Sequence, residues 1–162
     1  MTYKNFLIFV KERPRLTLLL KTVDILAVSF TVCAYTAVLV SEATDNILFA
    51  FKLLLVSATP FVIVSLLRRI IDAPRPYEFY DIYDTPPRRR EGRSFPSRHA
   101  FSIFAIGTST AFVCPALAAV ILLLGVALSA SRVLLGIHFP RDVIAGAVIG
   151  TVTSVIGMII MI

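Results

Sequence analysis

Several residue types are scarce in this chain. Its 162 residues include no tryptophan, two cysteines, two histidines and ten acidic residues. Cys33 and Cys114 both lie in apolar stretches, where they fit as small core residues, and nothing in the sequence pairs them. The cysteines therefore leave the redox compartment open.

Apolar residues dominate instead. Hydrophobic side chains make up 57% of the sequence. They form several segments that are each long enough to cross about 30 Å of hydrocarbon at about 1.5 Å per residue. A soluble helical core can be this apolar in one place, but it has no need of several such segments. We therefore predict an all-α fold, a polytopic bundle of membrane helices.

The charge balance does not indicate nucleic acid. Sixteen Lys and Arg residues against ten Asp and Glu residues give a formal net charge of +6. The basic residues lie beside the apolar segments, where anionic lipid headgroups and membrane orientation explain them more simply than a nucleic-acid partner does. We expect membrane lipids as partners, and the sequence indicates no oligomeric state.

We expect a single membrane-embedded domain over residues 1–162, with about five transmembrane helices and no internal repeat. Residues 1–16 have too short an apolar run and too many later charges for a cleavable signal, so we expect a basic amphipathic segment on the membrane surface. Near the start of the first span, Lys21 and Asp24 can pair or reach towards water. The predicted spans are about 17–40, 47–71, 97–113, 116–135 and 140–162.

Prolines and glycines indicate where these helices begin and how they pack. Pro96 and Pro140 each fit the first residue of a helix, because a proline there lacks only an amide that would be unpaired in any case. Gly146 and Gly150 form a small-xxx-small pair, which predicts that a neighbouring helix approaches closely.

The hairpin topology brings the unusual polar residues to one membrane face. The second span ends at 68–76, and the third begins on that face at Ser97. A tight turn at 114–115 makes the fourth span antiparallel to the third, so it returns to the same face at Arg132. The fifth span leaves from there after His138. Residues far apart in the sequence are therefore expected to share one site.

Arginines at this face suggest a site for phosphate. Guanidinium groups bind the tetrahedral oxygens of phosphate in pairs. The helix start after Pro96 adds backbone amides that attract an anion, with the hydroxyl of Ser97 beside them. The arginines of this predicted phosphate cage are Arg68, Arg75, Arg98 and Arg132.

The two histidines, His99 and His138, would allow a reaction to take place on a phosphate bound by these arginines. With a reference pKa of about 6.5, histidine serves as a neutral nucleophile or as a proton donor. One histidine can attack phosphorus while the other protonates the departing oxygen. Asp142 follows His138 by four residues at a helix start, where its carboxylate can accept the imidazole N–H and orient the other nitrogen.

Each of these residues also has a structural interpretation. Taken alone, Arg68 can anchor a helix end at the interface, His99 can be a satisfied histidine, and Asp142 can complement its helix dipole. The run Arg88–Arg90 is interpreted mainly as a surface that meets anionic lipid. Both histidines of the chain fall within spaced blocks on one face, and this combination favours a catalytic site.

The polar residues form three blocks with fixed internal spacing. The blocks are Arg68-x6-Arg75-Pro76, Pro96-Ser97-Arg98-His99 and Ser131-Arg132-x5-His138-x3-Asp142. Their order and spacing resemble the signature of the type 2 phosphatidic acid phosphatase (PAP2) superfamily, which also includes vanadium haloperoxidases. The resemblance covers roughly the last three fifths of the chain. Any one block would be a weak signal, whereas the three together are specific.

The resemblance implies a role for each residue. His138 would be the nucleophile that forms a phosphohistidine, Asp142 its orienting partner, and His99 the general acid for the leaving group. It also implies that no metal or other cofactor is needed, because the arginines supply the positive charge. The phosphate oxygens would be held by Arg68, Arg75, Ser97 and Arg132.

Two positions depart from the family's pattern. The family usually has lysine at the position of Arg68, and arginine keeps the charge but changes the geometry. It often has glycine at the position of Arg98. The amide of Arg98 can still reach phosphate, and its side chain can reach a second phosphate or a headgroup.

We therefore predict an integral membrane lipid phosphatase that hydrolyses a phosphomonoester or a diphosphate while the lipid tail stays in the bilayer. Candidate substrates are phosphatidate, phosphatidylglycerol phosphate and polyprenyl diphosphates. Two alternatives remain open. A lipid phosphotransferase would pass phosphate to an alcohol, and a catalytically silent protein would only bind anionic lipid.

The distribution of basic residues predicts the orientation. Of the sixteen Lys and Arg residues, all but Lys52 lie at or near the face of the three blocks, counting the N-terminal segment. The opposite connections, 41–46 and 114–115, contain none. The positive-inside rule therefore places the N-terminus and the active face in the cytoplasm. Family members commonly have six spans and an outward-facing site, and one span fewer before the first block would invert the site.

Overall fold

The computed structural model describes residues 2–82 and 92–160, so the basic run Arg88–Arg90 lies outside the described residues. The regular elements of the described part are all helices. The predicted all-α membrane bundle is confirmed. The helices are α1 (Tyr3–Lys11), α2 (Pro14–Asp45), α3 (Ile47–Ile71), α4 (Pro76–Phe79), α5 (Arg98–Thr110), α6 (Pro115–Leu134) and α7 (Pro140–Ile160).

Among the described residues, four helical segments are long and apolar enough to cross a membrane, namely Pro14–Asp45, Ile47–Phe79, Pro115–Leu134 and Pro140–Ile160. The remaining predicted span is α5, whose 13 residues extend about 20 Å, less than the hydrocarbon thickness. α2 extends beyond the predicted span at both ends. It begins at Pro14, in the favoured first helical position, and continues until Asn46, which caps α3 by accepting a hydrogen bond from the Phe49 amide.

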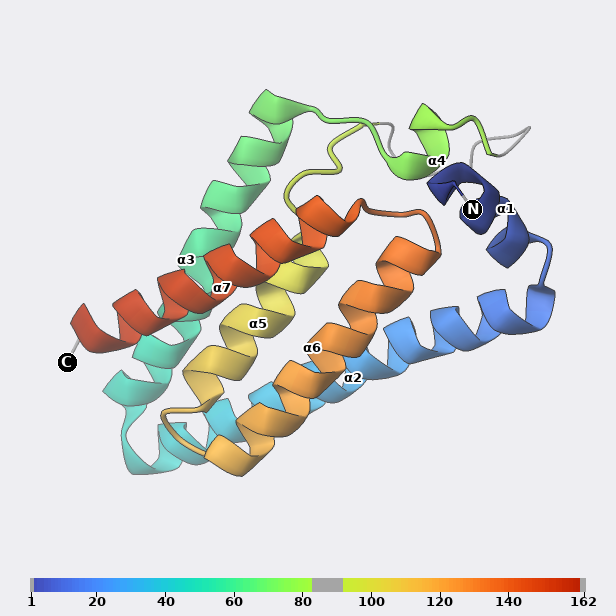
Figure 1. Cartoon of the computed structure of the whole chain (residues 1–162). Coiled ribbons are helices and arrows are strands. Elements are labelled where there is room, and N and C mark those ends of the chain that lie inside the picture. The colour runs from blue at the N-terminus through green and yellow to red at the C-terminus, as the bar shows by residue number, and fades with distance from the viewer. Residues whose placement is uncertain (1, 83–91, 161–162) are drawn as a thin grey trace.

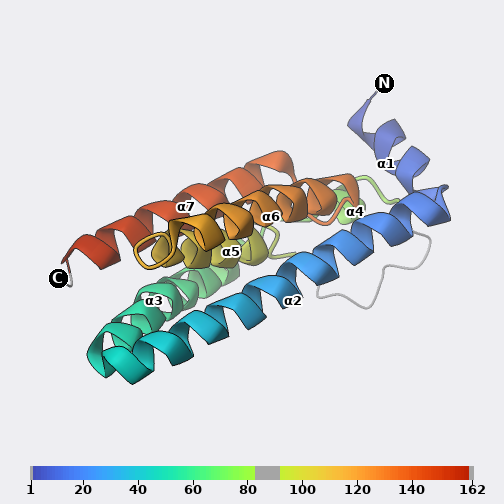
Figure 2. The same ribbon diagram turned by 90° about the horizontal axis from the view of Figure 1, so that it is seen from below.

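The short helix α5 lies at the centre of the bundle and contacts α7, α6, α3 and α2 (Figures 1 and 2). Phe101 and Ala105 of α5 pack against Val64 of α3. On another side, Ile103 joins a buried cluster with Ala27, Ile121 and Leu128 from α2 and α6. Large apolar side chains elsewhere face outward, as expected of helices that contact lipid, and examples are Leu18, Leu48, Ile70, Leu123 and Ile160.

The glycine pair of α7 allows this central packing. A Cβ atom on Gly146 would lie 2.5 Å from the carbonyl oxygen of Ser97, and one on Gly150 would lie 2.4 Å from that of Phe101. Real Cβ atoms do not approach backbone so closely, so α5 and α7 fit together only because these positions carry no side chain. The predicted close approach is confirmed, and its partner is the helix that begins after Ser97.

The start of α5 differs from the prediction. Pro96 is not the first helical residue: the helix begins at Arg98, and Ser97 is its N-cap, with a side-chain oxygen that accepts from the Ala100 amide. A serine in extended conformation satisfies one amide at the helix start, a role that proline cannot fill. Pro140, in contrast, begins α7 as predicted.

The N-terminal helix α1 packs over the same end of the bundle as the predicted site. The Tyr3 hydroxyl donates to the carbonyl of Val133 at 3.0 Å, and the Lys11 ammonium donates to the carbonyl of Ile82 at 2.7 Å. α1 therefore covers the segments that follow α4 and end α6. Its contact with a membrane surface stays a prediction.

Candidate active site

The helix ends that carry the predicted site residues lie together at one end of the bundle (Figure 1). α3 and α6 end there, and α5 and α7 begin there. The structure thereby confirms the convergence expected from the hairpin topology. Partial burial lowers the pKa of His99, in the first turn of α5, to about 3, and nearby groups from several elements act in the same direction, namely Arg132, His138, Arg98 and Arg68.

His138 and Asp142 are both buried, with 2% and 0% of their surface exposed. His138 lies in the loop between α6 and α7, and Asp142 lies in the first turn of α7. The distance from His138 Nδ1 to Asp142 Oδ2 is 3.6 Å, longer than a hydrogen bond. The hydroxyl of Ser94 lies beside both, 2.5 Å from Asp142 Oδ2 and 3.3 Å from His138 Nδ1.

Asp142 also connects the start of α7 to the start of α5. Its Oδ2 accepts a hydrogen bond from the Phe139 amide at 3.0 Å. Its backbone carbonyl accepts from the Ser97 amide at 2.9 Å. The Asp142 carboxylate and the N-cap residue Ser97 of α5 are therefore fixed relative to each other, and a shift of α5 or of α7 would disturb this arrangement.

The environment of His138 keeps its imidazole neutral. Burial lowers the pKa of His138 below its ordinary value of 6.5, and the guanidinium of Arg75 acts in the same direction. The nearby carboxylate of Asp142 opposes this shift without overcoming it. A neutral imidazole at neutral pH has a free lone pair, which a nucleophile requires.

Arg132 is held by an acidic residue of α2. Its Nε and Nη2 atoms donate to the two carboxylate oxygens of Asp24 at 2.7 and 2.6 Å, a two-pronged ion pair between residues 108 positions apart. The expected partner of Asp24 was Lys21 or water, and this expectation is wrong. The pair fixes the plane of the guanidinium near His99 and leaves Nη1 outside the two contacts with Asp24.

Two other predicted arginines hold the backbone around the site. The buried guanidinium of Arg68 donates through Nη1 to the carbonyl oxygens of Ser94 and Pro96. Arg75 donates through Nε to the carbonyl of Gly92 at 3.2 Å. Both arginines therefore hold the segment that leads into α5, and both act electrostatically on His138.

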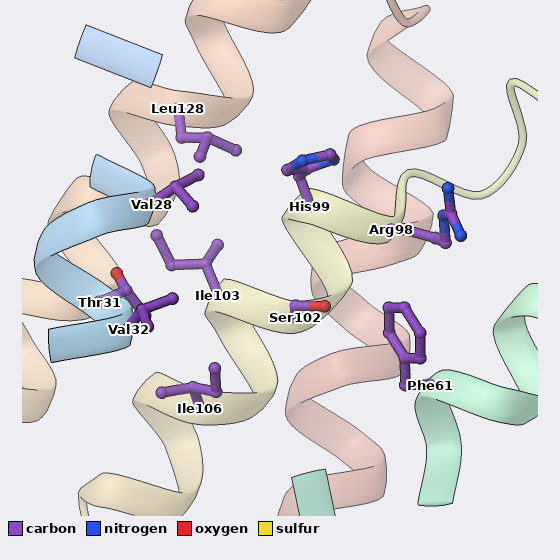
Figure 3. A pocket seen from close by; sticks show the side chains of 10 residues that line it. All are labelled: Val28, Thr31, Val32, Phe61, Arg98, His99, Ser102, Ile103, Ile106 and Leu128. Atoms are coloured by element: carbon purple, nitrogen blue, oxygen red, sulfur yellow. The ribbon is translucent and has the colours of Figure 1, made fainter. Parts of the chain in front are cut away.

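Arg98 and His99 are exposed and line an apolar cavity of about 350 Å³. Figure 3 shows both side chains and Ser102 projecting from α5 among apolar side chains of neighbouring helices. The Arg98 guanidinium lies 5.9 Å from the centre of the Phe61 ring. The remaining walls are formed by Val28, Thr31, Val32, Ile103, Ile106 and Leu128. The cavity thus has a charged region and a long apolar wall.

Two residues of the site were missing from the sequence-based set. Ser94 lies two positions before the predicted second block, but no spacing rule assigns a partner to its hydroxyl. Asp24 gave a clearer signal, because an acidic residue inside a membrane span usually has a specific partner. Only the structure shows that this partner is Arg132.

The donor set does not resemble a metal centre. Within residues 2–82 and 92–160, no group of three or more His, Cys, Asp or Glu side chains is arranged to hold a metal ion. The expectation that the arginines supply the positive charge stays a prediction.

Comparison with protein families gives the identity of this fold. The family model described as the PAP2 superfamily matches residues 31–161. The chain belongs to the PAP2 superfamily. This result confirms the resemblance that the three sequence blocks indicated. The matched range includes all three PAP2 blocks but leaves out Asp24.

Two curated relatives share part of the PAP2 sequence. The chain is 30% identical over 103 residues to a lipid A 1-phosphatase of Rhizobium johnstonii and 31% identical over 93 residues to a lipid A 1-phosphatase of Rhizobium etli. These alignments cover 61% and 55% of this chain. They cover 42% and 40% of the relatives, so the chain spans about two fifths of their length.

Solved structures share the fold. The crystal structure of Aquifex aeolicus LpxE matches with a TM-score of 0.69 and 22% identity, covering 90% of this chain and 87% of that one. A Bacillus subtilis structure, described as the first transmembrane PAP2 type phosphatidylglycerolphosphate phosphatase, matches with a TM-score of 0.72 and 20% identity. It covers 98% of this chain and 82% of that one. The arrangement of helices is therefore that of membrane PAP2 proteins.

Proposed function

We propose that this protein is a membrane lipid phosphatase that removes phosphate from a phosphomonoester or a diphosphate through a phosphohistidine on His138. The observation that carries the proposal is the placement of a buried, neutral His138 beside Ser94 and Asp142 at the end of the bundle where the arginines converge. Catalysis of phosphoryl transfer depends mainly on such positioning and on charge stabilisation.

The proposed reaction has two displacements. The negative charge of a bound phosphate raises the lowered pKa of His99, so that His99 takes up a proton with the substrate. The Nε2 lone pair of His138 attacks phosphorus, the bond from phosphorus to the lipid oxygen breaks, and His99 gives its proton to that oxygen. Water then attacks the phosphohistidine, His99 accepts the proton of the water, and the phosphorus–nitrogen bond breaks to restore His138. Asp142 stabilises the positive charge that develops on the His138 ring.

The positive side chains neutralise the phosphate oxygens as charge moves onto them. In this proposal the ion pair with Asp24 and the carbonyl contacts of Arg68 keep these guanidinium groups rigid, so that little reorganisation is needed when phosphate binds. The groups proposed to contact phosphate are Arg68, Arg75, Ser97, Arg98 and Arg132.

The cavity supports a lipid substrate. Its charged region at Arg98 and His99 suits a phosphorylated headgroup, and its apolar wall suits part of a hydrocarbon chain. The curated relatives are named lipid A 1-phosphatase, and one solved neighbour is described as a phosphatidylglycerolphosphate phosphatase. We therefore propose lipid A 1-phosphate, phosphatidylglycerol phosphate, phosphatidate and polyprenyl diphosphates as the substrates to compare.

A panel of these lipids, incubated with purified protein in mixed micelles, tests the proposal by release of inorganic phosphate. We expect release from at least one lipid, continued release in a metal chelator and inhibition by vanadate, an analogue of phosphate in its transition state. Glycerol 3-phosphate is the control without a tail, and we expect little turnover of it. Absence of release from every lipid, or transfer of phosphate only to an added alcohol, would contradict the hydrolase.

We also propose that the active face lies in the cytoplasm, because the basic residues gather at that end. Ser94 is fully buried and cannot report accessibility, so we choose exposed Asp72 on the active face and exposed Asp45 on the opposite face. Each is changed to cysteine in a background with Cys33 and Cys114 replaced by alanine.

In intact spheroplasts, an impermeant thiol reagent is expected to label Asp45→Cys at once and Asp72→Cys only after permeabilisation. The paired variants control for expression, since each chain carries one cysteine in an exposed position. Immediate labelling of Asp72→Cys with protection of Asp45→Cys would place the active face outside.

A further inference from the structure

The contact between His138 and Asp142 is not direct. Their nearest nitrogen and oxygen atoms are 3.6 Å apart, whereas the Ser94 hydroxyl is within hydrogen-bond distance of both. All three side chains are buried, so bulk water does not compete for these groups. The Ser94 hydroxyl therefore bridges the Asp142 carboxylate and the His138 imidazole, and the carboxylate can orient the imidazole through it.

The available protons determine which group donates in each of the two hydrogen bonds of Ser94. Ionised Asp142 only accepts hydrogen bonds, so the single hydroxyl proton of Ser94 is donated to Oδ2. The Ser94 oxygen is then an acceptor for the other contact, and His138 must donate through a protonated Nδ1. The lone pair of the neutral ring is consequently on Nε2.

Ser94 is itself held firmly by its backbone. Its amide donates to the carbonyl of Ala73 at 2.8 Å, and its carbonyl accepts from Arg68 Nη1 at 3.2 Å. Both partners belong to the end of α3 and the residues that follow it. A side chain on a backbone anchored twice has a defined position, as a relay between two other groups requires.

We propose that Ser94 is a positioning residue that links His138 to Asp142 and fixes the imidazole with its proton on Nδ1 and its lone pair on Nε2. Ser94 does not touch phosphate in this proposal. The inference rests on the proposed function, in which Nε2 of His138 attacks phosphorus.

Replacement of Ser94 by alanine tests the catalytic consequence. Loss of a hydrogen bond to a charged group should lower kcat about 10- to 100-fold and leave KM nearly unchanged, because the phosphate contacts remain. Ser94→Thr, which keeps the hydroxyl, should recover part of the loss. The matched control is Ser154→Ala, which removes an equally buried hydroxyl that donates to the Ala105 carbonyl, far from the site.

The scarcity of histidine permits a direct readout of the ring. In a His99→Gln background, His138 is the only histidine, and nitrogen-15 spectra of labelled protein report its tautomer. We expect protonated Nδ1 with Ser94 present and a mixture of tautomers in Ser94→Ala. An unchanged tautomer in Ser94→Ala, or a kcat no lower than in Ser154→Ala, would overturn the proposal.

This pair of measurements separates the relay from the proposed function. If His138 were not the nucleophile, His138→Ala would retain activity, while the tautomer would still respond to Ser94. If only the relay were wrong, His138→Ala would be inactive and the tautomer would not respond.

Discussion

Replacement of His138 by alanine is expected to lower phosphate release from a lipid phosphate by about 10⁴-fold or more, because removal of a nucleophile eliminates the covalent route. The side chain is buried, so its removal also leaves a cavity, and folding must be checked by size-exclusion profile and helix content. Steady-state release of inorganic phosphate from the best lipid substrate measures the effect.

His99→Ala provides the comparison that identifies the roles. A general acid contributes about 10²- to 10⁴-fold, so this variant should be strongly impaired on a lipid alkoxide leaving group. A substrate with a leaving group that needs no proton, such as a nitrophenyl phosphate ester, should restore much of its rate. The same substrate should not restore His138→Ala. Equal recovery of both variants, or full activity in His138→Ala, would contradict the assignment.

Replacement of Gly146 by alanine is expected to reduce activity by about 10²-fold although this residue makes no contact with phosphate. The added methyl carbon would lie 2.5 Å from the Ser97 carbonyl, which belongs to the backbone and cannot rotate away. The start of α5 must therefore move, and with it Ser97 and His99. Displacements of about 1 Å in a catalytic group have effects of this size.

Gly157→Ala on the same helix is the matched control. Its added carbon would meet methyl groups of the Val56 side chain at 2.9 and 3.1 Å, away from the site. We expect a lowered melting temperature for both variants but a large loss of kcat only for Gly146→Ala. Equal losses of kcat in the two variants would show that activity does not depend on the position of α5 that Gly146 allows.

The position of the site could be predicted because it follows from chain direction. Helices that alternate across a membrane return to a known face, so the ends of α3 and α6 and the starts of α5 and α7 had to meet. The spacing of His138 and Asp142 likewise places them on one side of a helix start. These features depend on the order and length of the segments, which the sequence displays directly.

The partners of individual side chains could not be predicted in the same way. Asp24 and Arg132 are 108 positions apart, and only the packing of α2 against α6 brings them together. Ser94 reaches His138 because Arg68 and Ala73 hold its backbone, an arrangement with no sequence periodicity. The sequence offers two possible helix starts here, with Pro96 as the first helical residue or with Ser97 as the N-cap. The structure has Ser97 as the N-cap, so that α5 begins at Arg98.

Detection of the phosphorylated intermediate is the most direct test of covalent catalysis by His138. Protein mixed with a ³²P-labelled lipid phosphate is quenched in alkali, where phosphohistidine survives, and is then digested and analysed by mass spectrometry. We predict label on the peptide that contains His138, its accumulation in His99→Ala with a good leaving group, and its absence in His138→Ala. Turnover with no labelled histidine, or with label on His99 instead, would show that His138 is not the nucleophile.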